Sequence, residues 1–345
     1  MSKSLAVQYR PKTFDDVVEQ DAVKIILKQQ LESGNIHSAM LFCGPSGDGK
    51  TTTARIFANE LNKGKGVPIE MDAASHNGVD DVREIVKMAS TKAVDAEYKV
   101  FIIDECHSIS NTGWQAFLKC IEEPPAKVVF IFCTTDPQKI PATILSRVQR
   151  FQFQKVSTNG IANRLKYILD QENITPMNFD GIDYIAKLSN GGMRLAIQYM
   201  EKCLAYSCDL KVADVVKALN VTDYNDFIGL TNLLLDPSDR ASLVTRLDEI
   251  YASGVDFKQF LKQNVSFILD INKALILDDL DDAFKYINLP RTSEIETWLT
   301  TVLEHGDLEF FNKLLSHLVK LDADVKYSQN PKVDIECGFL LFEVK

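Results

Sequence analysis

The sequence predicts an α/β domain with a parallel sheet, followed by a long stretch that is helical throughout. A strand-like apolar run at residues 39–43 leads through a glycine-rich loop into a helical pattern that ends near Leu61. Two further continuous apolar runs, residues 100–103 after Lys99 and residues 128–133, are typical of buried parallel strands. From Ser157 onward, apolar residues recur only at helical spacing.

The glycine-rich loop is the strongest motif, because it reads G-x-x-x-x-G-K-T between a strand and a helix. Its backbone N–H groups and the positive end of the following helix attract phosphate oxygens. We expect Lys50 to reach the β- and γ-phosphates of ATP and Thr51 to offer its hydroxyl to Mg²⁺. Asp48 places a carboxylate in this anion-binding loop, so we expect its side chain to face solvent. The candidate nucleotide-binding residues here are Gly44, Pro45, Ser46, Gly47, Asp48, Gly49, Lys50, Thr51 and Thr52.

The elements around the loop follow from spacing and from helix breakers. Residues 9–14 contain Arg10-Pro11 and are expected to be extended or turned, since the residue before proline avoids the α region. A helix is predicted over Asp21–Leu31, ended by Gly34. Beyond the loop, residues 67–71 are expected to form a strand and residues 79–89 a helix.

Two carboxylates follow the apolar run at residues 99–103, namely Asp104 and Glu105. Ligands of open α/β sheets bind at the carboxyl ends of the strands. We therefore expect Asp104 to hold Mg²⁺, directly or through water, and Glu105 to polarise the attacking water. A solvated strand end would explain one acid easily but explains two poorly, given the phosphate loop upstream.

The next strand, residues 128–133, ends at Thr134-Thr135. If it neighbours the strand that ends at Asp104, a threonine hydroxyl lies beside the γ-phosphate. Between these strands, Ser110 is expected to cap a helix. After them come a short helical piece at residues 141–146, then Arg147, Arg150 and a last strand at residues 151–153.

The helical remainder divides into a smaller and a larger part. Stripes at residues 161–169 and 181–188, and a helix opening at Met193 after Gly191-Gly192, suggest a small helical domain. The chain beyond Val221 is expected to remain helical, with prolines between the helices. We predict an α/β domain at 1–156, a helical lid at 157–221 and a helical collar at 222–345.

Composition limits the classes of protein that fit. The 345 residues carry a net charge of −10, so any surface that binds nucleic acid must be local. The seven cysteines are scattered without a Cys-x-x-Cys pair, which favours reduced thiols in a cytoplasmic protein. Cys43 and Cys133 lie in strand-like runs and are expected in the core. Membrane association is not expected, because no apolar run approaches the ~18 residues of a membrane span.

At this point the motifs match a known family. The sequence resembles AAA+ clamp-loader subunits, most closely the gamma/tau family of bacterial DNA polymerase III. Beyond the phosphate loop, the segments that carry this resemblance are Tyr9-Arg10-Pro11, residues 72–81, Asp104-Glu105-Cys106-His107, residues 122–125, residues 134–141, Ser146-Arg147 and residues 192–194.

The resemblance implies further roles. Tyr9, Arg10 and Pro11 would lie against the adenine. Thr135, in preference to Thr134, would sense the γ-phosphate, and Arg194 would be a second sensor on the helical lid. Arg147 would act in trans as an arginine finger on the ATP of a neighbouring subunit. Backbone contacts to DNA are implied for Asn77, Lys119, Lys139 and Thr143.

The resemblance also implies partners: other loader subunits in a pentameric ring, a sliding clamp, and primer-template DNA in a bacterial cytoplasm or nucleoid. In the family, the outer part of the helix that carries Trp114, Phe117 and Leu118 meets the clamp, but we expect these three side chains mainly in the core.

Several positions depart from the family pattern. Residues 59–69 run straight through where a four-cysteine zinc module is usual, so no zinc is expected. Glu19 stands where glycine is usual, and Val148 replaces the cysteine of Ser-Arg-Cys. The chain ends where the collar should end, so we expect no tau extensions. A compact form encoded by a virus or mobile element would fit.

Two other functions compete with the loader. Asp104-Glu105-Cys106-His107 reads as the D-E-x-H box of a large helicase class, but no strand pattern after Val156 could build a second helicase half. The second competing function is a stator, a subunit that shapes the assembly without hydrolysing ATP. The intact Lys50, Thr51, Asp104 and Glu105 argue against it.

Overall fold

The computed structural model describes residues 4–93, 95–176, 179–236 and 238–342. The chain forms two compact units, one of Met1–Thr175 with Ile185–Glu201, the other of Pro176–Tyr184 with Lys202–Lys345. Helices α8 (Asp180–Leu188) and α9 (Met193–Tyr206) contribute residues to both units. The three-domain division at 156 and 221 stays a prediction.

The first unit is built on a five-stranded sheet in the order β2-β3-β4-β1-β5. Every neighbouring pair of strands is parallel, as the continuous apolar runs predict. The strands are β1 (Ala39–Cys43), β2 (Ile69–Asp72), β3 (Lys99–Asp104), β4 (Val128–Thr134) and β5 (Gln149–Gln152).

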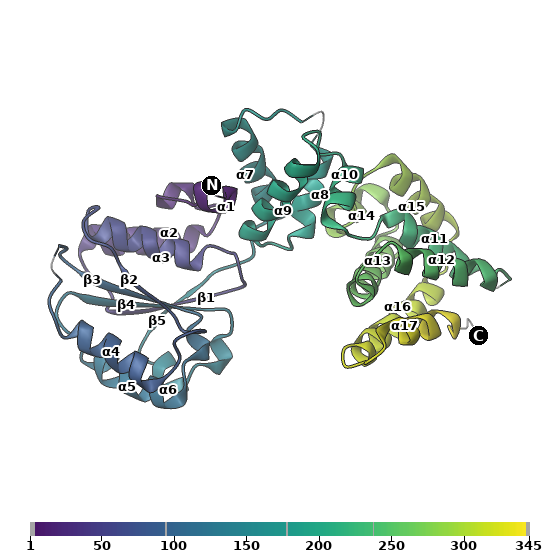
Figure 1. Ribbon diagram of the computed structural model, residues 1–345. Coiled ribbons are helices and arrows are strands. Elements are labelled where there is room, and N and C mark those ends of the chain that lie inside the picture. Colours follow the sequence, from purple (N-terminus) through teal and green to yellow (C-terminus); the bar gives the residue numbers. More distant parts are fainter. Residues whose placement is uncertain (1–3, 94, 177–178, 237, 343–345) are drawn as a thin grey trace. The chain divides into compact units, whose positions relative to one another are not determined.

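Side chains alternate between the two faces of this sheet, and helices cover both faces (Figure 1). Met40 and Phe42 lie in the cluster under α2 (Asp21–Ser33) and α3 (Lys50–Leu61). Leu41 lies in the opposite cluster. The helices on that second face are α4 (Val79–Ala89), α5 (Asn111–Glu122) and α6 (Ala142–Leu145).

Several predictions about this core are confirmed. Cys43 and Cys133 are fully buried. Trp114 and Phe117 are buried against Phe132, and Leu118 packs at the edge of the same cluster. Because these side chains are held in the core, α5 offers only its outer face to a partner.

The bounds of several helices and strands differ from those that the sequence predicts. Val67 is 89% exposed and lies outside β2, since Gly66 has a left-handed backbone and Pro68 has no N–H for a strand ladder. Strand β5 starts two residues earlier than expected because Gln149 already pairs with Met40. Two short helices, α1 (Leu5–Gln8) and η1 (Phe14–Asp16), were not predicted.

Helices alone follow β5 in the part of the chain that the structure describes. The first unit ends with α7 (Thr158–Gln171), the second part of α8 and the first part of α9. The remaining helices are α10 (Val212–Leu219), α11 (Tyr224–Leu235), α12 (Arg240–Ala252), α13 (Phe257–Leu277), α14 (Leu280–Tyr286), α15 (Ser293–His305), α16 (Leu308–Val325) and α17 (Pro331–Leu340).

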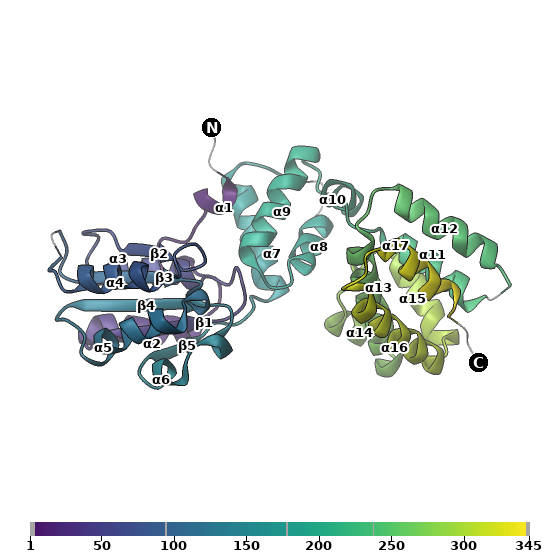
Figure 2. The same ribbon diagram turned by 60° about the horizontal axis from the view of Figure 1, so that its bottom comes forward.

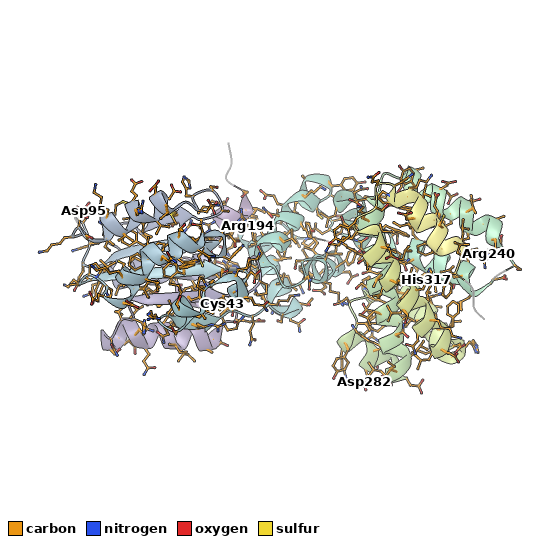
Figure 3. All side chains as sticks on the ribbon, turned by 90° about the horizontal axis from the view of Figure 1, so that it is seen from below. Cys43, Asp95, Arg194, Arg240, Asp282 and His317 are labelled. Carbon is orange, nitrogen blue, oxygen red and sulfur yellow. The ribbon has the colours of Figure 1, made fainter. Side chains whose placement is uncertain are left out.

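The second unit is organised around α13, which α14, α15, α16 and α17 all contact (Figure 2). Its buried Phe260, Phe267 and Ile271 lie in one continuous apolar cluster with residues of α11 to α17. Polar contacts hold the last helix and the residues after it. Arg240 donates to the carbonyls of Leu340 and Phe342. His317 Nε2 lies 2.8 Å from the Gly338 oxygen, and both Arg240 and His317 are labelled in Figure 3. None of the described helices is long and apolar enough to cross a membrane.

Candidate nucleotide site

The phosphate loop lies between β1 and α3, at the carboxyl ends of the strands. Cys43 at the end of β1 is paired with Thr134 at the end of β4, and β4 is the neighbour of β3, which ends at Asp104. This register brings the loop, the two acids and the threonine pair to one edge of the sheet, as predicted.

Glycine is required at two positions of the loop. A Cβ added to Gly44 would lie 2.3 Å from Asp48 Oδ2 and 2.6 Å from the Phe153 carbonyl oxygen. Gly49, the residue before α3, has φ 99°, a conformation that side chains disfavour. The close approach and the left-handed backbone explain why a tight phosphate loop forms here.

A cavity of about 200 Å³ collects most of the predicted nucleotide residues. Gly44 and Pro45 lie outside its lining, as does Arg147. The predicted residues that line it are Tyr9, Arg10, Pro11, Ser46, Gly47, Asp48, Gly49, Lys50, Thr51, Thr52, Asp104, Glu105, Thr135 and Arg194.

Thr51 and Asp104 form the pair expected to hold a metal. Thr51 Oγ1 donates a hydrogen bond of 2.7 Å to Asp104 Oδ2, and Asp104 Oδ1 accepts from the Glu105 N–H at 3.0 Å. A hydroxyl and a carboxylate oxygen side by side are the hard ligands that Mg²⁺ prefers. The donor set therefore fits Mg²⁺.

Glu105 is held in an uncommon conformation beside this pair. Its φ is 47°, which a non-glycine residue adopts at some cost and which recurs at functional sites. Thr135 Oγ1 donates to Glu105 Oε2 at 3.2 Å, and His107 Nδ1 lies 3.3 Å from the same oxygen. Thr134 is fully buried and accepts from the Asp136 N–H, so Thr135 is the threonine that faces the cavity.

The expectation that Asp48 faces solvent is wrong. The side chain is only 1% exposed, and its Oδ1 lies 3.0 Å from Lys50 Nζ. Burial raises the pKa of the Asp48 carboxyl, while the Lys50 charge opposes that rise. The sequence reasoning considered repulsion by phosphate but not the attraction of Lys50, two residues away in a tight turn.

The part of the cavity around Tyr9 includes residues that the sequence analysis did not predict. Arg164 on α7 lines it and donates to the Tyr9 carbonyl oxygen at 3.0 Å. The Tyr9 hydroxyl donates to Glu172 Oε1 at 2.5 Å. Apolar wall residues were also missed, and only Met193 lies in a segment that the motifs marked: Ala6, Val17, Val18, Val156, Met193 and Ile197.

Glu19, which stands where the resembled family has glycine, joins the N-terminal segment to the start of α7. It has φ 56°, and its carboxylate accepts from the Ser157 N–H at 3.1 Å and from the Ser157 hydroxyl. Next to it, the Gln20 side chain exchanges two hydrogen bonds with the backbone of Gln154. These contacts tie the wall that carries Val17 and Val18 to the chain leading into α7.

Arg194 and Arg147 lie in different surroundings. Arg194, labelled in Figure 3, is near the start of α9, and its Cβ is 3.7 Å from the position of a Cβ added to Gly47. Arg147 is exposed, 2.7 Å from Glu122 Oε1 through its Nε, and donates to the Thr143 carbonyl oxygen. The structure thus brings Arg194 to the phosphate loop and leaves Arg147 outside the cavity of its own chain.

The other predicted contacts are surface residues. Asn77, Lys119, Lys139 and Thr143 are all exposed, and their role with DNA stays a prediction. Among the residues that the structure describes, no three His, Cys, Asp or Glu side chains gather as a metal cluster. The expectation that the chain holds no zinc also stays a prediction.

The chain is similar to several known proteins. Residues 65–157 match the family model described as "DNA polymerase III, delta subunit". DNA polymerase III subunit tau of Bacillus subtilis is 30% identical over 350 residues, covering 95% of this chain and 61% of that protein. Protein STICHEL of Arabidopsis thaliana is 35% identical over 292 residues, covering 78% of this chain and 24% of that protein. The chain thus spans less than two thirds of each of these longer proteins.

Among solved structures, the Thermotoga maritima RuvB Holliday junction branch migration motor is similar, with a TM-score of 0.52. The likeness covers 72% of this chain and 86% of RuvB at 21% identity, and shows a shared fold. The chain is thus similar in sequence to the tau subunit of bacterial DNA polymerase III over most of its own length, and similar in fold to the RuvB motor.

Proposed function

We propose that this chain is the ATPase motor subunit of a DNA sliding-clamp loader. The observation that carries the proposal is a set of candidate hydrolytic residues around one cavity: Lys50, Thr51, Asp104, Glu105 and Thr135. The homology to gamma/tau subunits, which covers 95% of the chain in the Bacillus protein, supports a loader in preference to other AAA+ machines.

The reaction is in-line attack of water on the γ-phosphate of ATP. The loop N–H groups and Lys50 bind the phosphates, while Tyr9, Arg10, Pro11 and the apolar wall hold the base. Mg²⁺, held by Thr51 and Asp104, would supply charge neutralisation at the phosphates. Glu105 accepts the proton of the attacking water, and Thr135 orients the Glu105 carboxylate by the hydrogen bond already present.

Assembly would complete the site. Arg147 lies outside its own cavity and is proposed to reach the ATP of a neighbouring subunit, while Arg194 reaches the γ-phosphate from α9 of the same chain. We propose that ATP binding closes a ring of loader subunits around a sliding clamp and primer-template DNA, in the bacterial cytoplasm. Hydrolysis, stimulated by the DNA, would then release the clamp.

The DNA surface is proposed to track the phosphate backbone. Asn77, Lys119, Lys139 and Thr143 are exposed, although Lys139 also forms an ion pair of 3.2 Å with Asp136. Contacts to the backbone alone imply little sequence preference and strong salt dependence. Lys119 and Lys139 would supply the charge in these contacts.

ATP turnover of the purified chain, alone and with its partner subunits, primed DNA and cognate clamp, tests the function. Stimulation by primed DNA and clamp together is expected for a loader. Strand unwinding or branch migration without a clamp would instead favour the RuvB-like alternative, whose fold the chain shares. Absence of turnover in every combination would favour the remaining alternative, a stator subunit that does not hydrolyse ATP.

Replacing Glu105 by glutamine should separate binding from chemistry. The amide cannot take the proton from water, so turnover is expected to fall by about 10²–10⁴-fold. ATP binding should persist, because Glu105 is not among the phosphate-binding groups. Equilibrium binding and steady-state hydrolysis measure the two effects. Glu97→Gln is the control, since Glu97 forms only an exposed ion pair with Lys127, and equal turnover by the two variants would contradict the role.

A further inference from the structure

Lys50 is fully engaged within its own loop. Its ammonium donates to the Gly44 carbonyl at 2.8 Å, to the Pro45 carbonyl, and to Asp48 Oδ1 at 3.0 Å. A lysine ammonium has three N–H donors and no more. All three donors are therefore used by acceptors of the loop itself.

Asp48 is the charged partner among these three acceptors. Its carboxylate is buried, and Oδ2 has no hydrogen-bond partner among the described residues. All three bonds have a charged donor, but only the Asp48 bond also has a charged acceptor, which adds the Coulomb attraction of two opposite charges at a buried site. The Asp48 contact is thus the one that most favours the position in which Lys50 is held by its own loop.

The same carboxylate also lines the cavity where phosphates are expected. A negative charge there repels phosphate, and the repulsion is strong where water is excluded. Asp48 therefore opposes triphosphate binding in two ways, by holding Lys50 and by its own charge.

From this geometry we infer that Asp48 is a positioning residue for Lys50 that restrains nucleotide binding until the ion pair opens. Triphosphate entry must exchange the Asp48–Lys50 pair for a phosphate–Lys50 pair. The inference rests on the proposed nucleotide-binding function and deepens it. It assigns the loop a built-in threshold for ATP, set by a side chain that is not one of the proposed hydrolytic groups.

The test is Asp48→Asn in the full-length chain. The amide keeps the shape and one acceptor but removes the charge. The Kd for Mg-ATP, measured by titration against a fluorescent ATP analogue, should fall about tenfold, or about 1.4 kcal/mol. In steady state the KM for ATP should fall while kcat changes little. A purely structural carboxylate would not produce this split, because its loss would weaken binding.

A matched control and a second variant make the result interpretable. Glu97→Gln removes an acid that is also 3.0 Å from a lysine, Lys127, but on the exposed surface, and should leave the Kd unchanged. Asp48→Ser removes the carboxyl altogether and should tighten binding in the same direction. Thermal melting of each protein establishes that it is folded at the assay temperature.

The outcomes separate the two proposals. If wild type binds ATP and both Asp48 variants bind equally or more weakly, the restraint is overturned and the proposed function stands. If neither wild type nor any variant binds, both fail. Variants that do not fold would show that the carboxylate is needed for the loop itself, which also overturns the restraint. Tighter binding by the Asp48 variants alone supports it.

Discussion

Replacing Lys50 by alanine should reduce ATP turnover by at least about 10³-fold and weaken ATP binding. The variant loses the only lysine that lines the cavity in the described part of the chain, and with it the charge that stabilises the transferring phosphoryl group. Steady-state hydrolysis with primed DNA and clamp measures the first effect, and equilibrium binding of Mg-ATP the second.

The Lys50 variant needs a folding control, because it leaves the Asp48 carboxylate buried without its counter-charge. Melting of Lys50→Ala and of the double variant with Asp48→Asn separates instability from loss of catalysis. The double variant should have a higher melting temperature than Lys50→Ala but remain inactive. Lys127→Ala, which removes an exposed ion-paired lysine, should keep full turnover. Substantial turnover by folded Lys50→Ala would show that the loop is not the catalytic phosphate site.

Replacing Arg147 by alanine should lower DNA-stimulated turnover of the assembled oligomer by about 10³–10⁵-fold. The guanidinium lies outside the cavity of its own chain, so the isolated variant should bind ATP as wild type does. Its ion pair with Glu122 is on the surface, and its loss should change stability by less than about 1 kcal/mol.

Mixing subunits gives the sharpest measurement of the Arg147 role. Lys50→Ala chains cannot hydrolyse ATP but still present Arg147, and Arg147→Ala chains have an intact cavity. Mixed oligomers should therefore recover part of the turnover that each variant lacks alone. Arg150→Ala, which removes a nearby exposed arginine, is the control and should be active by itself. An inactive mixture would contradict action in trans.

The boundaries of elements show where sequence patterns stop being informative. Cys43 and Thr134 mark strand ends that apolar runs predicted, because a buried strand needs apolar residues along its whole length. Gln149 belongs to β5 only because its backbone pairs with Met40. Backbone pairing leaves no trace in residue type, so the last strand was predicted too short.

The missed site residues have a similar explanation. Arg164 lies on a helix whose apolar stripe predicts only burial, and its contact with Tyr9 joins residues 155 positions apart. Glu19 departs from the family's glycine, yet the sequence offered no partner for it until Ser157 was found beside it. Long-range partners of polar side chains cannot be inferred from local spacing.

The sequence by itself determined the chemistry proposed for this protein, since the phosphate loop and the paired acids are contiguous motifs whose local geometry follows from residue type. The tertiary structure alone decided how those groups are engaged. It placed Thr135 and not Thr134 in the cavity, and it turned Asp48 inward onto Lys50. The physical reason is that a buried charge takes the nearest opposite charge available, and only the folded loop defines which one is nearest.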